Sequence, residues 1–399
     1  MEQKMIKKLD KAALLAKAEE VGQLAELEAM EAEKNARISD QVVQAMKDGE
    51  FGKLWVPERY GGYGRDMDLW TYKEFVRTIS RHSMAAGWLG YFYSIHEVWV
   101  AQMNTKGREE ILNHGGFVAD VVAPLGRVEK DGDDYRFYGE YNYASGIPHS
   151  DWVGLAAVME LPDSTEPEYC LLALPVSDCK IVENWDSLGL RASGSNRVEV
   201  DGVKVPLHMI LPAGRLLVTG NTTGGDYDEN EPVYRMPFMP FFTMGFSLVV
   251  LGGAERIISL FQERTEKRNR IFRGGVEEKS NTSSHRVLAE LKMMFFELEG
   301  HVDHYIRILE EWQTQAKVTT TDEEKALMYA LRGKIAKLGA EIAFKAMLTV
   351  GAACTLKGDP MELFTRDLIQ LATHGSHLYE DSMAVYGGTI FGLPGSPVW

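Results

Sequence analysis

Proline placement is the feature that most limits how this chain can fold. Of its 14 prolines, ten lie between Pro124 and Pro240, and none falls at 58–123 or 241–359. Because proline interrupts helix interiors, the two proline-free blocks are where long helices can run. The sequence predicts three units, which are a helical domain over 1–116, a β domain over 117–232 and a helical bundle over 233–399.

The central block carries the pattern of short β-strands. Apolar and polar residues alternate on both sides of the turn Asp131-Gly-Asp-Asp134, and short apolar runs follow at 152–159, 169–174 and 197–205. Strands of this length and spacing predict a small antiparallel barrel or sandwich. No Gly-x-Gly-x-x-Gly follows a strand, so a nicotinamide-binding Rossmann domain is not indicated.

The second proline-free block predicts long helices at about 243–272, 284–315, 322–356 and 360–380. These four segments are long enough to pack against one another as a C-terminal four-helix bundle. The predicted fold class is therefore α+β, with a helical domain, a small β domain and a helical bundle in chain order.

Charge and composition exclude several classes of function. The net charge is −15 and no basic face stands out, so we expect no nucleic-acid partner. The three cysteines show no metal-ligand spacing, which argues against a metal centre and a disulfide framework. No stretch reaches the roughly 18 uninterrupted apolar residues of a membrane span, and residues 1–8 lack a signal-peptide pattern. We expect a soluble, cytoplasmic protein with no membrane partner.

Residues 141–152 form the first candidate site. A polar, strand-like run ends at Ser145-Gly146, turns through Pro148 and passes into a second strand-like run. This places a lone hydroxyl, flanked by aromatic rings, at a strand end beside a flexible glycine. Such a position suits contact with a planar ligand. An ordinary turn with a solvated serine is the alternative.

Two histidines and a basic cluster are further candidates in the helical blocks. His96 lies in a run that is apolar on all sides, where it is either a hydrogen-bonded core residue or a functional one. His374 precedes Gly375 near a helix end, so it either projects into a cavity or caps the helix. The basic cluster at 264–273 either complements the helix dipole or binds a phosphate.

Several segments, taken in order, resemble motifs of the acyl-CoA dehydrogenase superfamily over nearly the whole chain. Residues 55–64 are similar to that family's loop after an early helix. Tyr143-Ala-Ser-Gly146 resembles its Trp-x-Thr/Ser motif, whose hydroxyl contacts the flavin ring. Residues 189–196, followed by Val203-Lys-Val-Pro206, resemble a segment of its β domain. The order and spacing of these motifs imply the acyl-CoA dehydrogenase-like fold.

The residue before Gly375 distinguishes two branches of that superfamily. In the dehydrogenases a glutamate just before a glycine, a few residues after a final Arg-Asp, removes the α-proton of the substrate. Here Arg366-Asp367 is followed by His374-Gly375, so a histidine stands where the carboxylate would be. This pattern resembles the flavin-dependent monooxygenases of the same fold, the two-component aromatic hydroxylases and the dibenzothiophene-type monooxygenases. The same resemblance assigns His96 to an active-site helix.

The resemblance also implies a cofactor, partners and residue roles. The implied cofactor is reduced FMN or FAD, delivered by a separate flavin reductase and converted by dioxygen to a hydroperoxyflavin that oxygenates a small aromatic substrate. The implied catalytic residues are Ser145 beside a ring nitrogen, His374 as acid or base, and His96, which orients the substrate or the peroxide oxygen. The implied cofactor-binding residues are Tyr143, Ala123, Ser145, Ser195 and Arg270, the last reaching a flavin phosphate in the neighbouring subunit of a homotetramer.

Two other interpretations stay open. Glu380 and Asp381 lie close to His374 in the sequence, so the chain could be an acyl-CoA dehydrogenase or a flavin oxidase with a relocated carboxylate base. The chain could also be a non-enzymatic scaffold of this fold that has lost its flavin. Retention of Ser145 and of both histidines argues against that second alternative.

Overall fold

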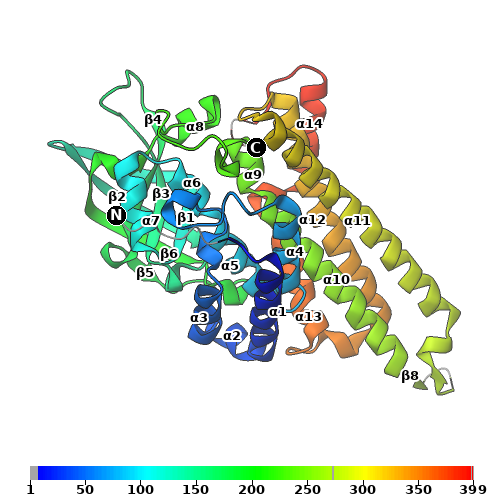
Figure 1. Cartoon of the computed structure of the whole chain (residues 1–399). Helices are drawn as coiled ribbons and strands as arrows, with labels where there is room; N and C mark the ends of the chain where they lie inside the picture. Colours follow the sequence, from blue (N-terminus) through cyan, green and yellow to red (C-terminus); the bar gives the residue numbers. More distant parts are fainter. Residues whose placement is uncertain (1–7, 272–273, 397, 399) are drawn as a thin grey trace.

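The computed structural model describes residues 8–271, 274–396 and 398. Figure 1 shows a β-sheet on one side of the molecule and the long helices α10, α11 and α12 on the other, with shorter N-terminal helices between them. The order along the chain is helical, then β, then helical, which agrees with the distribution of prolines.

The N-terminal part is built from short helices that begin at polar capping residues. Its helices are α1 (Lys11–Leu27), α2 (Ala29–Asn35), α3 (Asp40–Asp48), η1 (Phe51–Lys53), η2 (Glu58–Tyr60), α4 (Leu69–Ser80), α5 (Met84–Ile95), α6 (Glu97–Ala101) and α7 (Thr105–His114). The side chains of Asp10, Ser39, Asp68, Ser83 and Asn104 each accept a backbone N–H of the first turn. These caps fix where the helices start. Every residue of α5 is buried, as its all-apolar sequence predicts.

The central part forms a seven-stranded sheet with the order β5-β6-β2-β1-β3-β4-β7. The strands are β1 (Val118–Asp131), β2 (Asp134–Ala144), β3 (Trp152–Met159), β4 (Glu168–Pro175), β5 (Lys180–Val182), β6 (Asn196–Val205) and β7 (Ile210–Leu211). Strands β1 and β2 form the predicted hairpin, with Asp131 opposite Asp134.

The prediction of a wholly antiparallel sheet is wrong, because β1 and β3 are parallel neighbours. After β2 the chain crosses the beginning of β1 before β3 starts. At this crossing the Asp151 N–H donates to the Phe117 carbonyl at 2.8 Å, and the Asp151 carboxylate accepts from the Phe117 N–H at 3.0 Å. Strand β3 therefore starts beside the start of β1, with Trp152 opposite Val118, and runs in the same direction. The crossing segment carries Ser145 to this end of the sheet.

The C-terminal part contains the long helices. Its elements are α8 (Ala213–Thr219), η7 (Pro232–Tyr234), α9 (Phe238–Phe242), α10 (Met244–Lys267), the hairpin β8 (Asn269–Arg270) and β9 (Val276–Glu277), α11 (Thr282–Gln315), α12 (Asp322–Val350), α13 (Pro360–Ala372) and α14 (Tyr379–Ile390). The single helix predicted over 360–380 is wrong. Helix α13 ends at Ala372, the turn η11 (Gly375–His377) follows, and α14 begins at Tyr379.

Residues 238–267 are, within the described part of the chain, the one helical segment long and apolar enough in composition to cross a membrane. Of its most apolar window, 83% is buried against the rest of the protein. The core helix of a globular domain has this same composition, because it is surrounded by protein on all sides.

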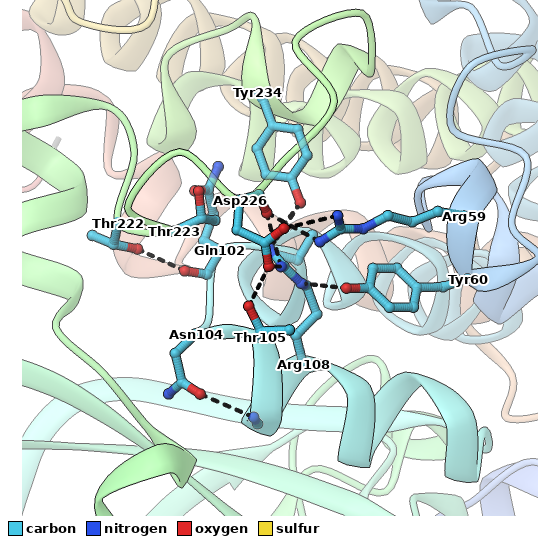
Figure 2. A network of polar contacts seen from close by, with 12 residues as sticks. Arg59, Tyr60, Gln102, Asn104, Thr105, Arg108, Thr222, Thr223, Asp226 and Tyr234 are labelled. Atoms are coloured by element: carbon cyan, nitrogen blue, oxygen red, sulfur yellow. Dashed lines mark hydrogen bonds and ion pairs between the residues drawn. The ribbon is translucent and has the colours of Figure 1, made fainter.

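A buried arginine attaches the connector at 220–231 to the N-terminal helices (Figure 2). Arg108 is fully buried, and its Nη2 donates to both the carbonyl and the carboxylate of Asp226 at 2.9 Å. Its Nε donates to the Tyr60 hydroxyl at 2.8 Å. Hydrogen bonds from Thr105 and Arg59 to the Asp226 carboxylate, with the nearby positive charges, lower the pKa of that group to about 2. The connector is thus held by charge-assisted hydrogen bonds.

Candidate active site

A cavity of about 330 Å³ lies where the turns of the sheet meet the end of α13. The sheet side contributes hydroxyl and aromatic side chains, and α5 contributes Trp88. The end of α13 and the following turn contribute Thr373, His374 and Gly375. The cavity therefore brings together the serine and the histidine that the sequence singled out as separate candidates.

A chain of hydroxyl groups forms one wall of this cavity. The Ser145 and Ser195 hydroxyls are 2.8 Å apart, and the Ser195 and Ser193 hydroxyls are 2.7 Å apart. Trp88 Nε1 donates to Ser145 Oγ at 3.0 Å. An indole N–H can only donate, so Ser145 accepts this bond and keeps its own proton for another partner. Trp88 therefore fixes the direction in which the Ser145 hydroxyl can act.

The backbone around Ser145 adopts conformations that favour glycine. Gly146 has φ +73°, its N–H donates to the Ser193 carbonyl at 2.9 Å, and its own carbonyl accepts from the Tyr93 hydroxyl at 2.9 Å. A β-carbon at Gly146 would lie 2.5 Å from the Tyr93 hydroxyl oxygen. This position consequently requires glycine for space as well as for conformation.

Tyr143 is the strained residue at the rim. It has φ +72° without being glycine, a conformation that costs on the order of 1–3 kcal/mol and that clusters at ligand sites. Its ring is 71% exposed and meets the ring of Trp185 edge-on, with the centroids 6.0 Å apart. Trp185 is itself held by a hydrogen bond from its Nε1 to the Leu190 carbonyl at 2.9 Å. Two aromatic rings thus border the hydroxyl wall.

The loop that carries Trp185, Ser193 and Ser195 is anchored to α13. The Leu190 N–H donates to the buried Asp367 carboxylate at 2.7 Å. Burial raises the pKa of Asp367 to about 7. The Arg366-Asp367 pair, which the sequence marked only as a landmark, therefore has a structural role here.

Gly189 is expected not to tolerate alanine, because an added β-carbon would lie 2.2 Å from the Arg366 carbonyl oxygen. We expect Gly189→Ala to destabilise the protein by about 1–3 kcal/mol, as overpacking against backbone does, measured from the urea midpoint of tryptophan fluorescence. Gly300→Ala is the matched control, since Gly300 in α11 has no atom within 4 Å of its added β-carbon. The control should be neutral or slightly stabilising. Equal midpoints for the two variants would contradict this view of the loop.

His374 faces the cavity with a defined tautomer. The Ser376 N–H donates to His374 Nδ1 at 3.2 Å, so Nδ1 is unprotonated and the ring proton sits on Nε2. Desolvation by the surrounding protein, and then the charge of Arg332, lower the pKa of His374 to about 4. A neutral imidazole that offers an N–H is therefore the form present at neutral pH.

His377 is a second histidine at the same end of α13. It is 1% exposed, and its ring lies 5.1 Å from that of Phe246 and 6.0 Å from that of His374. Its Nδ1 donates to the Leu371 carbonyl at 3.0 Å, so its Nε2 is unprotonated, and this atom bonds to no described residue. Burial, then His374 and Arg332, lower its pKa well below the usual value.

The stability of the protein is expected to fall with acidification because of His377. A lowered folded pKa means that the group favours folding above its unfolded pKa of about 6.5, and that this contribution is lost as the pH falls. His377→Asn keeps a donor for the Leu371 carbonyl but cannot be protonated. We expect this variant to lose less stability than the parent between pH 7 and pH 5, measured by urea unfolding. Parallel loss in both proteins would contradict the assignment.

His96 lies outside the lining of this cavity, on the far side of an aromatic layer. Its ring is 4.7 Å from that of Phe92, which itself packs on Trp88. His96 Nδ1 donates to the Val118 carbonyl at 2.7 Å, and its Nε2 is 3.5 Å from Asp120 Oδ2. Burial raises the pKa of Asp120, while the charge of His96 opposes the rise. His96 and Asp120 therefore form a buried acid–base pair, and the catalytic role predicted for His96 stays a prediction.

Two of the predicted cofactor-binding residues also lie away from the cavity. Ala123 is exposed on β1, within the stretch where the register with β3 shifts. Arg270 lies in the β8–β9 hairpin and forms a two-pronged ion pair with Glu278, which lowers the pKa of Glu278 to about 2. Their contacts with a flavin stay predictions.

Carboxylates are missing from the cavity wall. Among the described residues that line it there is no aspartate or glutamate. Glu380 and Asp381, the alternative bases, lie in the first turn of α14 and do not reach this lining. The described residues also hold no group of three or more histidine, cysteine, aspartate or glutamate side chains placed to share a metal ion.

Two residues of this site went unrecognised in the sequence. Trp88 lies in a helix that is apolar on all sides, so no periodic pattern in the sequence marks one of its faces. Its hydrogen-bond partner Ser145 is 57 residues away. Asp120 follows the first residues of a strand and carries no motif. Asp120 lies beside His96 only because β1 packs against the end of α5 in the folded chain.

Comparison with known proteins agrees with the fold. No protein-family model matches the chain. It is 26% identical over 376 residues to the oxygenase subunit HsaA, a flavin-dependent monooxygenase of Rhodococcus jostii (strain RHA1), covering 92% of this chain and 95% of HsaA. It is 23% identical over 375 residues to the oxygenase component of p-hydroxyphenylacetate 3-hydroxylase from Acinetobacter baumannii, covering 92% and 86%.

The structure resembles that of XiaF from Streptomyces sp., solved in complex with FADH2 and glycerol. The TM-score is 0.88 and the identity 22%, over 98% of this chain and 97% of XiaF. The similarity in sequence and in structure extends over nearly the full length of both partners. This chain is a homologue of the oxygenase components of two-component flavin-dependent monooxygenases, and it has their acyl-CoA dehydrogenase-like fold.

Proposed function

We propose that this chain is the oxygenase component of a two-component monooxygenase that hydroxylates a small aromatic substrate. One oxygen atom of O2 enters the substrate and the other leaves as water, with two electrons supplied by reduced flavin. The observation that carries the proposal is the cavity in which the oriented hydroxyl of Ser145 and the neutral ring of His374 line the same space.

The lining suits an isoalloxazine ring. Trp185 and Tyr143 offer aromatic surfaces, and the serine hydroxyls offer donors and acceptors for the ring nitrogens and carbonyls of a flavin. Ser145 is the best placed of them, since its remaining proton and lone pair are directed by Trp88. When bound, reduced flavin supplies the electrons that activate dioxygen, while the protein supplies position and electrostatics.

The remaining residues bind the substrate and exclude water. His374 presents its Nε2–H to the cavity, so it donates a hydrogen bond to a phenolic oxygen more readily than it removes a proton from one. Phe246 and Trp88, stacked with ring centroids 5.1 Å apart, form an apolar surface beside it. Because this apolar surface excludes water, it strengthens each polar contact inside the cavity and limits the reaction of activated oxygen with water.

The proposed cofactor is reduced FMN or FAD. XiaF was solved with FADH2, and TdsC from Paenibacillus sp. A11-2, with a TM-score of 0.81 and 15% identity to this chain, was solved with FMN and indole. We assign Ser145, Ser195 and Tyr143 to the ring, and Ala123 and Arg270 to the rest of the cofactor. Arg270 would have to release Glu278 in order to contact a phosphate of a neighbouring copy.

We further propose a separate reductase, a homotetramer and a cytoplasmic location. The relatives bear the names oxygenase subunit and oxygenase component, which supports a reductase partner. Met293, Phe296 and Leu348, on α11 and α12, are 65%, 60% and 81% exposed, and covering them would favour association of copies. The three cysteines are free thiols, which suits a reducing compartment.

Binding of reduced flavin tests the proposal. Anaerobic titration with reduced and oxidised FMN and FAD, followed by tryptophan fluorescence, should show that a reduced form binds at least 10-fold more tightly than its oxidised form. Preference for the oxidised form of both flavins would contradict a two-component oxygenase, because such an enzyme must release the oxidised product to its reductase.

Trp88→Phe is expected to reduce hydroxylation while sparing the fold. The variant keeps an aromatic ring beside Phe246 but removes the N–H that orients Ser145. Loss of one hydrogen bond of about 1 kcal/mol predicts a roughly 5-fold lower product yield for each reduced flavin consumed. Trp152→Phe is the control, since the indole N–H of Trp152 bonds to no described residue. Equal yields in the two variants would exclude an orienting role for Trp88.

The alternative of an acyl-CoA dehydrogenase or oxidase with a relocated base has less support. Its chemistry needs a carboxylate near the substrate α-carbon, and Glu380 and Asp381 do not line the cavity. A flavin-free scaffold is also disfavoured, because the strained Tyr143 backbone and the oriented Ser145 hydroxyl would then serve no ligand.

A further inference from the structure

A second cavity, of about 290 Å³, lies within the N-terminal helical part. Its walls come from α3, η1, η2, α6, α7 and the turn that leads into β1. None of its lining residues lines the first cavity. It is therefore a space separate from the first cavity, and α6, which follows His96, contributes Glu97 to its wall.

Glu97 is the unusual member of this lining. It is 4% exposed, and it forms no hydrogen bond or ion pair with any described residue. Buried carboxyls are almost always paired or hydrogen-bonded, because an unpartnered polar group away from water is costly. Burial alone raises the pKa of Glu97 to about 8, so at neutral pH the group is a protonated carboxyl with an O–H to donate.

Tyr60 and Lys47 are further donors in the lining of this cavity. Tyr60 Oη already accepts from Arg108 Nε at 2.8 Å, which leaves its own proton for another acceptor. Lys47 lies at the mouth, with its Nζ 5.6 Å from the centroid of the Phe117 ring. Lys53 is paired with Glu50 at 3.0 Å, so those two charges offset each other. The cavity therefore offers several hydrogen-bond donors. Its Lys47 ammonium has no carboxylate partner among the described residues.

The apolar surface of the cavity fits a ring. Val56, Leu112 and Phe117 form its apolar wall, and Phe117 is held in a stack with Tyr93 at a centroid distance of 4.0 Å. We propose that this cavity is a second binding site, which takes a small aromatic carboxylate. The ring packs on Phe117 and Leu112, and the carboxylate accepts hydrogen bonds from the Glu97 carboxyl and the Tyr60 hydroxyl near the Lys47 ammonium. Such charge-assisted bonds are stronger than neutral ones.

An aromatic carboxylate explains why the buried Glu97 carboxyl has no hydrogen-bond partner among the described residues. A cationic ligand would meet the Lys47 ammonium, unpaired among the described residues, and a neutral apolar ligand would leave Glu97 and Tyr60 without acceptors. The titratable and charged groups that face the cavity are Lys47 from α3, Glu50 just before η1, Lys53 from η1, Tyr60 from η2 and Glu97 from α6.

The test is calorimetric titration of the full chain with benzoate, benzylamine and benzyl alcohol at pH 7 and pH 9. Benzoate should bind in preference to both other probes, about 10-fold more weakly at pH 9 than at pH 7 as Glu97 loses its proton. Glu97→Gln should still bind benzoate but lose this pH dependence, because an amide donates at both pH values. Glu97→Leu should bind at least 10-fold more weakly.

Two blocking variants locate the site. Leu112→Trp should abolish benzoate binding by filling the second cavity, and Thr373→Trp, in the lining of the first, should leave binding unchanged. Loss of binding in Thr373→Trp with retention in Leu112→Trp would assign benzoate to the first cavity and overturn the proposal. Preference for benzylamine, a pH dependence that persists in Glu97→Gln, or no benzoate binding at pH 7 would overturn it as well.

Discussion

Replacing Ser145 with alanine is expected to lower the product formed per reduced flavin by about 10- to 100-fold. The Trp88 N–H orients this hydroxyl, and hydrogen bonds to charged or strongly polarised groups are worth about 1.5–3 kcal/mol. The measurement is product against flavin oxidised, with hydrogen peroxide determined in parallel. The lost product should reappear as peroxide, because oxygen activation would continue without control of its outcome.

Ser193→Ala is the matched control for Ser145→Ala. Ser193 belongs to the same chain of hydroxyls and lines the same cavity, but it contacts Ser145 only through Ser195. We expect it to change the yield by about 3-fold or less, as for a peripheral hydrogen bond. A Ser145→Ala protein that hydroxylates as well as its parent would remove Ser145 from the catalytic residues.

Replacing Arg108 with methionine is expected to destabilise the protein by about 3 kcal/mol. The change keeps the length of the buried side chain but removes its donors to Asp226, Tyr60 and the Ala101 carbonyl. Removing one partner of a buried charged pair typically costs about 3–5 kcal/mol, and the partial exposure of Asp226 places this case at the lower end. The urea midpoint of tryptophan fluorescence provides the measurement.

Arg59→Met serves as the control for Arg108→Met, because Arg59 contacts the same Asp226 carboxylate from an exposed position. An exposed pair contributes about 1 kcal/mol or less, so Arg59→Met should leave the midpoint nearly unchanged. If the two variants were equally destabilised, the connector at 220–231 would depend on the Asp226 charge and not on the buried guanidinium.

Local patterns predicted much of this architecture. Most of the two proline-free blocks is helical, the turn at 131–134 joins β1 and β2, and the all-apolar run at 84–95 is the buried helix α5. These features depend on neighbours in the sequence, and so they can be read without knowing the fold. The Ser145 turn and the His374 turn were also recognisable, since each interrupts a regular pattern.

Long-range contacts explain what the sequence did not disclose. The parallel pairing of β1 with β3 depends on which side of β1 the crossing segment at 145–151 passes, and no local pattern determines that side. The break after Ala372 is a local exception, because the His374 ring accepts the Ser376 N–H and caps the turn η11 in place of a further helical turn. The bond from Trp88 to Ser145 joins a featureless helix to a distant turn, so only the folded chain reveals it.

The most direct test of the central claim is the rate at which protein-bound reduced flavin is reoxidised by oxygen. Protein loaded anaerobically with reduced FMN or FAD is mixed with oxygenated buffer, and the absorbance of oxidised flavin is followed together with hydrogen peroxide. The proposed function predicts that this absorbance returns at least 10-fold more slowly than for free reduced flavin, and that Ser145→Ala shortens the delay. Return as fast as that of free flavin, with immediate release of peroxide, would contradict it.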